Sequence, residues 1–218
     1  MTIELYAFPP SPRSFKVMAV ANHLGLEWTL RLIDLTKGEQ KAPQFAALNP
    51  NMRVPTLKDG DFVLWESNAI NQYLALRRPE SGLFPADERA RLDVVRWQSW
   101  ELAHWDPACA VFAFEYVAKR LVLGITEPDQ AALAKGTEMF HRVAAVLDAH
   151  LKGRKFVSGD ALTLADFSLG AAMNLVDVAH YPIEPYAEIK RWHAGLAALP
   201  SWQKTLGQCA LPAAAAAA

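Results

Sequence analysis

The stretch IELYAFPPSPRSFKVMAVANHLGLEWTLRL, residues 3–32, decides the fold. Apolar and polar residues alternate in IELYA and again in WTLRL, which is typical of short strands. Between these segments, Ser11 and Pro12 begin a helix whose apolar residues share one face, and Gly25 follows where that helix ends. Two strands joined by a helix pair in parallel through a right-handed crossover, so this stretch is predicted to form a β-α-β unit.

The residues that follow add a hairpin and two more helices. A short helix begins at Pro43, and the strand-like segments VPTLK and FVLW flank the turn sequence DGD. Ser67 caps a last helix, which ends near Leu76. Residues 1–77 are therefore predicted to be a small domain, in which a β-α-β unit is followed by β-β-α.

Beyond this domain the pattern becomes helical. Residues 78–86, RPESGLFPA, contain two prolines and a glycine and are predicted to be a linker. The predicted helices span about 87–122, 130–151, 164–179, 186–196 and 200–207. The fold class is thus α+β, with residues 87–218 as an all-helical second domain. The low-complexity tail Ala213–Ala218 is expected to have no role.

Composition excludes several classes of function. The 218 residues include 22 Lys and Arg against 23 Asp and Glu, so a net charge of −1 offers no electrostatic surface for nucleic acid or an anionic membrane. No apolar run approaches the ~20 residues of a membrane span, and no secretory signal is visible. Cys109 and Cys209 form neither a CxxC motif nor a metal-ligand spacing. We therefore expect a cytoplasmic protein without a thioredoxin-type redox site.

Five motifs occur in an order that resembles the cytosolic glutathione transferases. They are SPRSFKV at residues 11–17, KGEQK at 37–41, NPNMRVP at 49–55, WESNAI at 65–70 and SGDALTLADF at 158–167. The first motif is similar to that of serine-type members of the theta and phi classes, and the chain is identified as a bacterial-type member. The resemblance covers essentially the whole chain. It implies a thioredoxin-like first domain, glutathione as co-substrate, and no metal.

The resemblance implies that Ser11 donates a hydrogen bond to the sulfur of glutathione. A thiol attacks as its thiolate, and lowering its pKa from ~8.5 to about 6.5 requires ~2.7 kcal/mol of preferential stabilisation. A charge-assisted hydrogen bond of ~1.5–3 kcal/mol and a helix N-terminus of ~0.3–1 kcal/mol together suffice. Ser11 would then be a donor and not a base. Two alternatives stay open: Ser11 only caps the helix at Pro12, or Ser14 is the donor.

Two further motifs are assigned to the γ-glutamyl and cysteinyl parts of glutathione. Ser67, at a helix N-terminus, forms an anion site that suits the γ-glutamyl carboxylate, and Glu66 suits the ammonium group beside it. The resemblance implies a cis bond between Val54 and Pro55, which turns the Val54 backbone outward to pair with the cysteinyl backbone like an added strand. The alternatives are a plain helix cap with an exposed glutamate, and a trans proline at a strand start.

The glycyl carboxylate is assigned to a polar loop and to the segment before the cis-proline. Lys41 and Arg53 supply positive charge there, and Gln40 supplies a neutral donor; the alternative is that all three are solvated loop residues. The chain departs from the family at this end of the site. Many members have a glycine where this chain has Met52, and many theta- and phi-like members have a histidine where it has Gln40.

The helical domain contributes a structural motif and most of a candidate electrophile pocket. Thr163 and Asp166 have the spacing of a capping box, in which each side chain satisfies the other's backbone N–H group, and we interpret the pair as structural. For the members of this pocket that lie in the helical domain, the alternative is packing in the helix core or at the dimer interface. The residues assigned to the pocket are Pro10, His104, Trp105, Cys109, Phe112 and Phe114.

These assignments predict a glutathione transferase, which joins the glutathione thiolate to small hydrophobic electrophiles. A glutathione-dependent peroxide or disulfide reductase needs the same thiolate, and a non-catalytic transferase-like binding module is the alternative of another kind. The resemblance also implies a homodimer, with the helix from Asp87 at its interface. Trp97, Trp100 and Trp105 give that helix a large aromatic surface, which is typical of interfaces but also fits a thick helical core.

Overall fold

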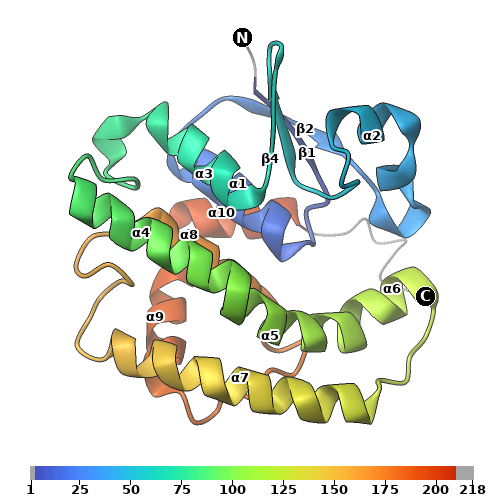
Figure 1. The fold of residues 1–218 in the computed structure, drawn as a ribbon, viewed down its shortest axis with the longest axis vertical. Coiled ribbons are helices and arrows are strands. Elements are labelled where there is room, and N and C mark those ends of the chain that lie inside the picture. The colour runs from blue at the N-terminus through green and yellow to red at the C-terminus, as the bar shows by residue number, and fades with distance from the viewer. Residues whose placement is uncertain (1–2, 210–218) are drawn as a thin grey trace. The chain divides into compact units, whose positions relative to one another are not determined.

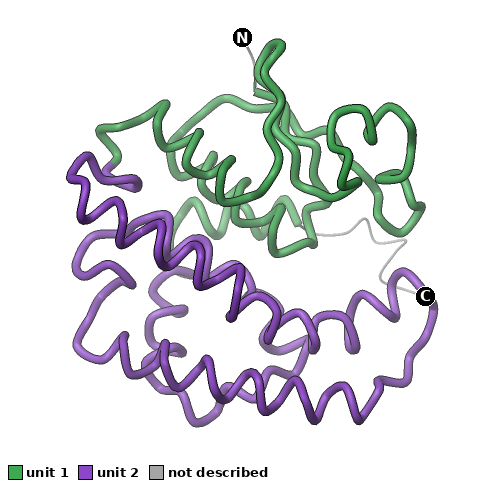
Figure 2. Tube along the Cα trace, in the orientation of Figure 1, with its two compact units in different colours: residues 1–81, 198–218 green, residues 82–197 purple. Residues whose placement is uncertain are grey.

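A computed structural model describes residues 3–209 and divides the chain into two compact units (Figure 2). Unit 1 combines Met1–Ser81 with Ala198–Ala218, and unit 2 is the intervening segment Gly82–Ala197. The tail Ala213–Ala218 lies outside the described residues. Within residues 3–209, no helix is long and apolar enough to cross a membrane, and no group of three or more His, Cys, Asp or Glu side chains could hold a metal ion.

Unit 1 contains a mixed four-stranded sheet, in which the strands lie in the order β2-β1-β3-β4 (Figure 1). The strands are β1 (Ile3–Ala7), β2 (Trp28–Leu32), β3 (Thr56–Asp59) and β4 (Phe62–Trp65). β1 pairs in parallel with β2, which places Leu5 opposite Leu30, and antiparallel with β3, which places Leu5 opposite Leu57. Alternate residues of β1 are buried, so the β-α-β unit expected from residues 3–32 is confirmed.

Four α-helices of the described chain complete unit 1. They are α1 (Pro12–His23), α2 (Pro43–Leu48), α3 (Ser67–Leu76) and α10 (Pro200–Gln208), with short 3-10 turns at Leu35–Lys37, Glu39–Lys41 and Pro79–Ser81. α1 contacts both α3 and α10, and Phe15 packs edge-on against Trp202 with ring centroids 4.9 Å apart. This central position explains why every residue of α1 from Ser14 to Ala21 is buried.

The last helix packs along α1. Asn22 donates to the Thr205 hydroxyl at 2.8 Å, and a ring nitrogen of His23 lies 3.2 Å from the Ser201 hydroxyl. The predicted division placed α10 in the helical domain, whereas the structure groups it with unit 1, because its buried Trp202 covers α1. Sequence periodicity shows that a helix has an apolar face, but not which neighbour buries that face.

Unit 2 is built from helices. They are α4 (Glu88–Trp100), α5 (Asp106–Phe112), α6 (Lys119–Leu123), α7 (Gln130–Leu151), α8 (Leu164–Gly170) and α9 (Ala187–Ala197). Two π-helical turns, Glu101–Trp105 and Ala113–Ala118, join α4, α5 and α6 into the continuous run predicted for residues 87–122. The helix predicted over 164–179 is too long, because α8 ends at Gly170, a poor helix former, and continues as a 3-10 turn.

The start of α8 confirms the predicted capping box. Asp166 is fully buried and accepts hydrogen bonds from the backbone N–H groups of Thr163 at 2.9 Å and Val157 at 2.8 Å. The Trp192 indole donates to the same carboxylate at 2.9 Å. Burial raises the pKa of the Asp166 carboxyl, and the donors around it act in the opposite direction. The motif therefore holds α8 and α9 together as a buried polar centre.

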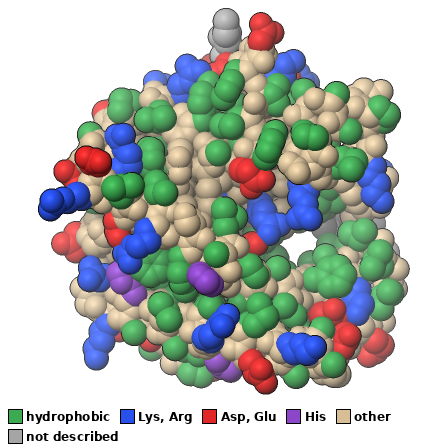
Figure 3. Space-filling model, in the orientation of Figure 1, with side chains coloured by type: hydrophobic (Ala, Val, Ile, Leu, Met, Phe, Trp, Pro, Cys, Tyr) green, Lys and Arg blue, Asp and Glu red, His purple; other side chains and the backbone are tan. Residues whose placement is uncertain are grey.

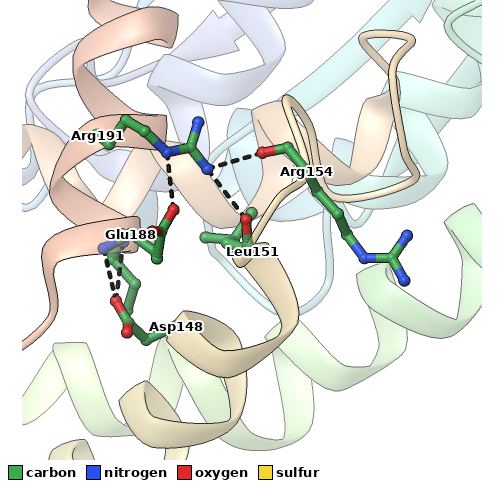
Figure 4. A network of polar contacts seen from close by, with 6 residues as sticks. Asp148, Leu151, Arg154, Glu188 and Arg191 are labelled. Carbon is green, nitrogen blue, oxygen red and sulfur yellow. Dashed lines mark hydrogen bonds and ion pairs between the residues drawn. The ribbon is translucent and has the colours of Figure 1, made fainter.

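A polar network ties the end of α7 to the start of α9 (Figure 4). The Asp148 carboxylate accepts from the backbone N–H of Glu188 at 2.9 Å and from the next N–H at 3.1 Å, and so caps α9. Arg191 donates to the carbonyl oxygens of Leu151 and Arg154, at 3.0 and 2.7 Å. Because these bonds satisfy helix ends, we interpret the network as structural.

Of the three tryptophans in the α4–α5 run, Trp97 and Trp105 are buried and Trp100 is partly exposed. Trp105 is fully buried, and its indole N–H donates to the Leu169 carbonyl oxygen at 3.0 Å. Trp97 is also buried, with its ring centroid 4.5 Å from that of His150 and 5.3 Å from that of Trp100. The core of unit 2 thus buries two of the three tryptophans whose aromatic surface was expected to support a dimer interface.

Candidate active site

Ser11 lies between β1 and α1. It directly precedes the first helical residue of α1, with φ −72° and ψ 128°, and Pro12 follows it. Its hydroxyl makes no capping hydrogen bond, whereas its backbone N–H donates to the Phe8 carbonyl at 2.9 Å. The alternative that Ser11 is a plain cap therefore has no support in the geometry. The hydroxyl is available at the positive end of the helix.

Ser14 has a different environment. It is fully buried, and its hydroxyl oxygen accepts a hydrogen bond from the Phe8 backbone N–H at 3.2 Å. This bond braces the loop before Ser11 against the first turn of α1. With no exposed surface and an internal partner, Ser14 is the weaker candidate for contact with a ligand thiol.

Neither cysteine offers a competing thiolate. Cys109 is buried in α5, and burial raises the pKa of its thiol well above the ordinary value. Cys209 donates through Sγ to the Pro9 carbonyl at 3.1 Å, and burial raises its pKa to about 11. Both groups are therefore thiols at neutral pH, which leaves nucleophilic sulfur chemistry to a bound thiol ligand.

The start of α3 differs from the prediction by one residue. Glu66, and not Ser67, precedes the first helical residue, and its φ of 72° and ψ of 111° are rare outside glycine and typical of strained functional positions. Ser67 is the first helical residue and is buried. The first intrahelical bond runs from Ile70 to Glu66, so the N–H groups of the first turn point out of the helix end, as an anion site requires.

The loop before β3 depends on a residue that we did not identify from the sequence. Asn49 is buried and donates to the Arg53 carbonyl at 2.8 Å and to the Thr56 hydroxyl at 3.1 Å. The Val54–Pro55 peptide bond in this loop is cis, as the resemblance implied. The available signal was the Asn-Pro pair at the start of the motif, because such pairs favour turns.

The residues assigned to the glycyl carboxylate lie in two loops that flank α2. Lys41 ends the 3-10 turn before α2, Arg53 lies in the loop after it, and both are exposed. Gln40 is partly buried, and its side-chain oxygen is buried without a hydrogen-bond partner among residues 3–209. Met52 adopts φ 52° with its side chain exposed, so the loop keeps a left-handed residue without the glycine of other family members.

The residues assigned to the electrophile pocket separate into two groups. Those buried in the core of unit 2 are Trp105, Cys109 and Phe112, and they fit the alternative of helix packing. Those with exposed surface are His104, Phe114 and, partly, Pro10. Periodicity could not separate the groups, because the π-helical turns shift the helix faces along the run.

Comparison with protein families gives two matches. "Glutathione S-transferase, N-terminal domain" matches residues 1–76, and "Glutathione S-transferase, C-terminal domain" matches residues 104–200. "Glutathione S-transferase 3" of Zea mays is 36% identical to this chain over 217 residues, which cover 96% of each protein. The chain therefore belongs to the glutathione S-transferase family, and its activity is that of a glutathione S-transferase.

Solved structures agree with this assignment. The structure of glutathione S-transferase III in apo form has a TM-score of 0.85 at 34% identity and covers 97% of this chain and 99% of that one. Glutathione S-transferase-I bound with lactoylglutathione has a TM-score of 0.84 at 25% identity, with 95% and 99% covered. The predicted fold class, a thioredoxin-like domain plus an all-helical domain, is confirmed. Bacterial-type membership gains no support from the Zea mays relative.

Proposed function

We propose that this chain joins the thiolate of bound glutathione to small hydrophobic electrophiles, with Ser11 stabilising the thiolate. The observation that carries the proposal is the Ser11 hydroxyl, which makes no capping bond at the N-terminus of α1. A structure of the same fold holds lactoylglutathione, a glutathione derivative, which supports glutathione as the ligand here.

In the proposed reaction, the thiol of glutathione loses its proton and the sulfur then forms a bond to the electrophilic carbon. The glutathione thiol releases its proton to solvent, and the Ser11 O–H donates to the resulting thiolate, which the positive end of α1 also stabilises. The sulfur lone pair forms a bond to the electrophilic carbon. Either a leaving group then departs with its electron pair, or the adduct takes up a proton. Serine stays neutral throughout, because its hydroxyl is too weak an acid to ionise.

The other parts of glutathione are assigned along unit 1. The first turn of α3, with Ser67, takes the γ-glutamyl carboxylate, and Glu66 takes the ammonium group. Val54, beside the cis-proline, offers its backbone to the cysteinyl backbone. The glycyl carboxylate is assigned to Gln40, Lys41 and Arg53. Each of these assignments depends on glutathione lying extended past the start of α1.

Pro10 is the best supported of the electrophile residues. It directly precedes Ser11 and is partly exposed, so an electrophile held against it would lie beside the thiolate. His104 and Phe114 are exposed on unit 2 and stay candidates for the same role.

Substituting Ser11 tests the proposal. In Ser11→Ala, conjugation of glutathione to an activated aryl chloride should slow by ~10–100-fold, because ~1.4–2.7 kcal/mol of thiolate stabilisation is lost. The pKa of the bound thiol, measured by thiolate absorbance, should rise, while glutathione affinity should change little in calorimetry. Ser14→Ala is the control, and it should leave that pKa unchanged. An unchanged pKa in Ser11→Ala, or a raised one in Ser14→Ala alone, would overturn the assignment.

We also propose a homodimer in the cytoplasm. Unit 1 exposes apolar side chains on β4 and α3, among them Phe62, Trp65 and Leu76, and unit 2 exposes Leu92 on α4. Basic and acidic side chains are interspersed over the face seen in Figure 3, so no single-sign charge on that face opposes association. Sedimentation at micromolar concentration should give about twice the chain mass of 24.1 kDa. Trp65→Glu should shift it to a monomer; a wild-type monomer contradicts the dimer.

A further inference from the structure

A cavity of unit 1 lies between the second half of α1, the start of β2 and α10. Its volume is about 410 Å³, within the range of ~300–1,000 Å³ that small-molecule sites occupy. Its apolar wall consists of Met18, Leu26, Trp28 and Leu30, and none of its lining residues is assigned to glutathione. The cavity therefore has the size and the apolar surface of a ligand site that the proposed reaction does not use.

The apolar wall is open because β2 is the edge strand of the sheet. Trp28 lies opposite Ile3 of β1 in the parallel register, and Leu30 lies opposite Leu5. Paired residues of neighbouring strands point to the same face of a sheet. The two β1 residues are buried, whereas Trp28 is half-buried and Leu30 is 37% exposed. Burial of this face thus ends at β2, which leaves an aromatic and an aliphatic side chain in reach of a ligand.

Asn22 holds the walls of the cavity together. Its side-chain nitrogen donates to the Thr205 hydroxyl and to the Gln208 side-chain oxygen of α10, each at 2.8 Å. Its side-chain oxygen accepts from the Trp28 indole N–H at 3.4 Å. One residue thus connects α1, β2 and α10 and fixes the indole ring that lines the cavity. Walls held in this way are formed before a ligand binds, which reduces the entropy lost on binding.

Two opposite charges at the cavity have no protein partner in the described chain. Glu27, directly before β2, and Lys204, on α10, both line the cavity and are exposed. Among residues 3–209, neither makes a hydrogen bond or an ion pair through its side chain, with the other or with any third residue. A ligand with one charge would be attracted by one of them and repelled by the other. A ligand that carries both an anionic and a cationic group suits both.

A second cavity indicates where the anionic group lies. Its volume is about 350 Å³, and it shares Asn22 and Lys204 with the first. His23 and Ser201, at the end of α1 and the start of α10, also line it. Burial lowers the pKa of the His23 imidazole, so Lys204 is the only cation at neutral pH among the described residues that line the two cavities. An anionic group is therefore expected at Lys204, near the positive end of α10.

We propose that these two cavities bind an α-amino acid with an aromatic side chain, in its zwitterionic form. The carboxylate pairs with Lys204, the ammonium group pairs with Glu27, and the ring lies against Trp28 and Leu30. Aromatic rings prefer such offset contacts with an indole, and the two ligand charges match the two unpaired charges of the cavity. No bond of the amino acid forms or breaks there, so this is a binding site in addition to the proposed transferase site.

Four probes separate the contributions of the ligand groups. They are L-phenylalanine, 3-phenylpropionate, which lacks the ammonium group, 2-phenylethylamine, which lacks the carboxylate, and L-alanine, which lacks the ring. Titrations followed by ligand-observed NMR give each affinity, with saturating glutathione present to fill the proposed active site. L-phenylalanine should bind about fivefold more tightly than either single-charge analogue, as expected for one exposed ion pair. L-alanine should bind at least ~10-fold more weakly than L-phenylalanine, because it buries no ring.

Two substitutions test the two charges separately. Lys204→Met should weaken L-phenylalanine binding about fivefold without weakening that of 2-phenylethylamine, which has no carboxylate. Glu27→Gln should weaken L-phenylalanine binding by a similar factor without weakening that of 3-phenylpropionate. Both residues are exposed and unpaired in the described chain, so neither substitution should disturb folding. Lys135→Met, which removes an exposed lysine from α7 of unit 2, is the matched control and should leave every affinity at the wild-type value.

Three results would overturn the proposal. Wild-type protein that binds L-phenylalanine no more tightly than the analogues, or not at all, does not recognise both charges. An equal loss for all probes in Lys204→Met or Glu27→Gln shows that the substituted charge is not what the ligand meets. Affinities that stay unchanged in both variants place the amino acid at another site, such as the proposed electrophile pocket. None of these results bears on the glutathione thiolate, which Ser11→Ala tests separately.

Discussion

Among residues 3–209, the α-helices of unit 2 that follow a loop begin under side-chain caps, whereas the α-helices of unit 1 do not. Asp87 and Asp129 accept backbone N–H groups, each at 2.9 Å, at the starts of α4 and α7. In unit 1, α2 and α10 follow Ala42 and Leu199, which have no capping group, and α1 follows Ser11, whose hydroxyl does not cap. Serine commonly caps helices, but the hydroxyl of Ser11 makes no capping hydrogen bond at the start of α1.

The helix N-termini of the two units thus differ in role: those of unit 2 are stabilised by side-chain caps, and two of those in unit 1 are assigned to ligand binding. A side-chain cap contributes ~1 kcal/mol, and α4, α7 and α8 all have this stabilisation. At α1 and α3 the residue before the helix keeps a functional group free of any capping role, the hydroxyl of Ser11 and the carboxylate of Glu66. Two of the four uncapped α-helix starts of unit 1, those of α1 and α3, thus coincide with residues assigned to the ligand, whereas those of α2 and α10 do not.

The largest effect on stability is expected at the start of α8, which carries the capping box. Asp166→Ala leaves the buried N–H groups of Thr163, Val157 and Trp192 without their acceptor. The free energy of unfolding should fall by ~3–5 kcal/mol, as for other buried networks. Urea unfolding followed by circular dichroism measures the change. Asp166→Asn keeps one acceptor oxygen and should lose less; equally small losses in both variants would show that this cap is dispensable.

A gain in stability is expected at the start of α3, which has no side-chain cap. Glu66 is held at φ 72°, a strained angle for a residue other than glycine. Glu66→Gly relieves this strain but also increases the entropy of the unfolded chain. The net result should be a rise of about 1 kcal/mol in the free energy of unfolding. Glutathione affinity should fall, because the carboxylate assigned to the ammonium group is lost. Glu66→Gln is the control. It should lose affinity without the gain in stability, and a stabilised Gln variant would point away from backbone strain.

The smallest effect on stability is expected at Ser11. Ser11→Ala removes no capping bond, so the free energy of unfolding should change by less than ~0.5 kcal/mol, whereas Asp129→Ala should lose ~1 kcal/mol. Thermal and urea unfolding of the two variants side by side measure the difference. If Ser11→Ala loses as much as Asp129→Ala, Ser11 caps α1 in solution and the contrast between the two units disappears.

Much of unit 1 was predictable because its elements depend on neighbouring residues. The alternation in IELYA and WTLRL is sufficient to predict β1 and β2, and Pro12 and Pro43 mark helix starts. The capping box of α8 likewise lies within four consecutive residues. The start of α3 was wrong by one residue, because the unusual backbone angles of Glu66 leave no trace in residue type.

The rest could not be predicted, because it depends on partners distant in the chain. Lys16 lies within an apolar stretch, and its partner Asn68 is 52 residues away. Trp202 covers α1 from the far end of the described chain. Trp97 and Trp105 are apolar in any interpretation, and only the fold shows that the core of unit 2 buries them. A single sequence carries the pattern of burial but not the identity of the covering residue.

The packing of α10 on α1 also has a consequence for biosynthesis. Chains begin to fold from the N-terminal side as they leave the ribosome, at about 5–20 residues per second. Here the residues of unit 2 emerge before Pro200–Gln208, so unit 1 stays incomplete until unit 2 and then α10 have been synthesised. Until then Phe15 lacks its partner Trp202, and one side of α1 is uncovered. A stalled chain would thus present chaperones and proteases with the unit that carries the proposed glutathione site.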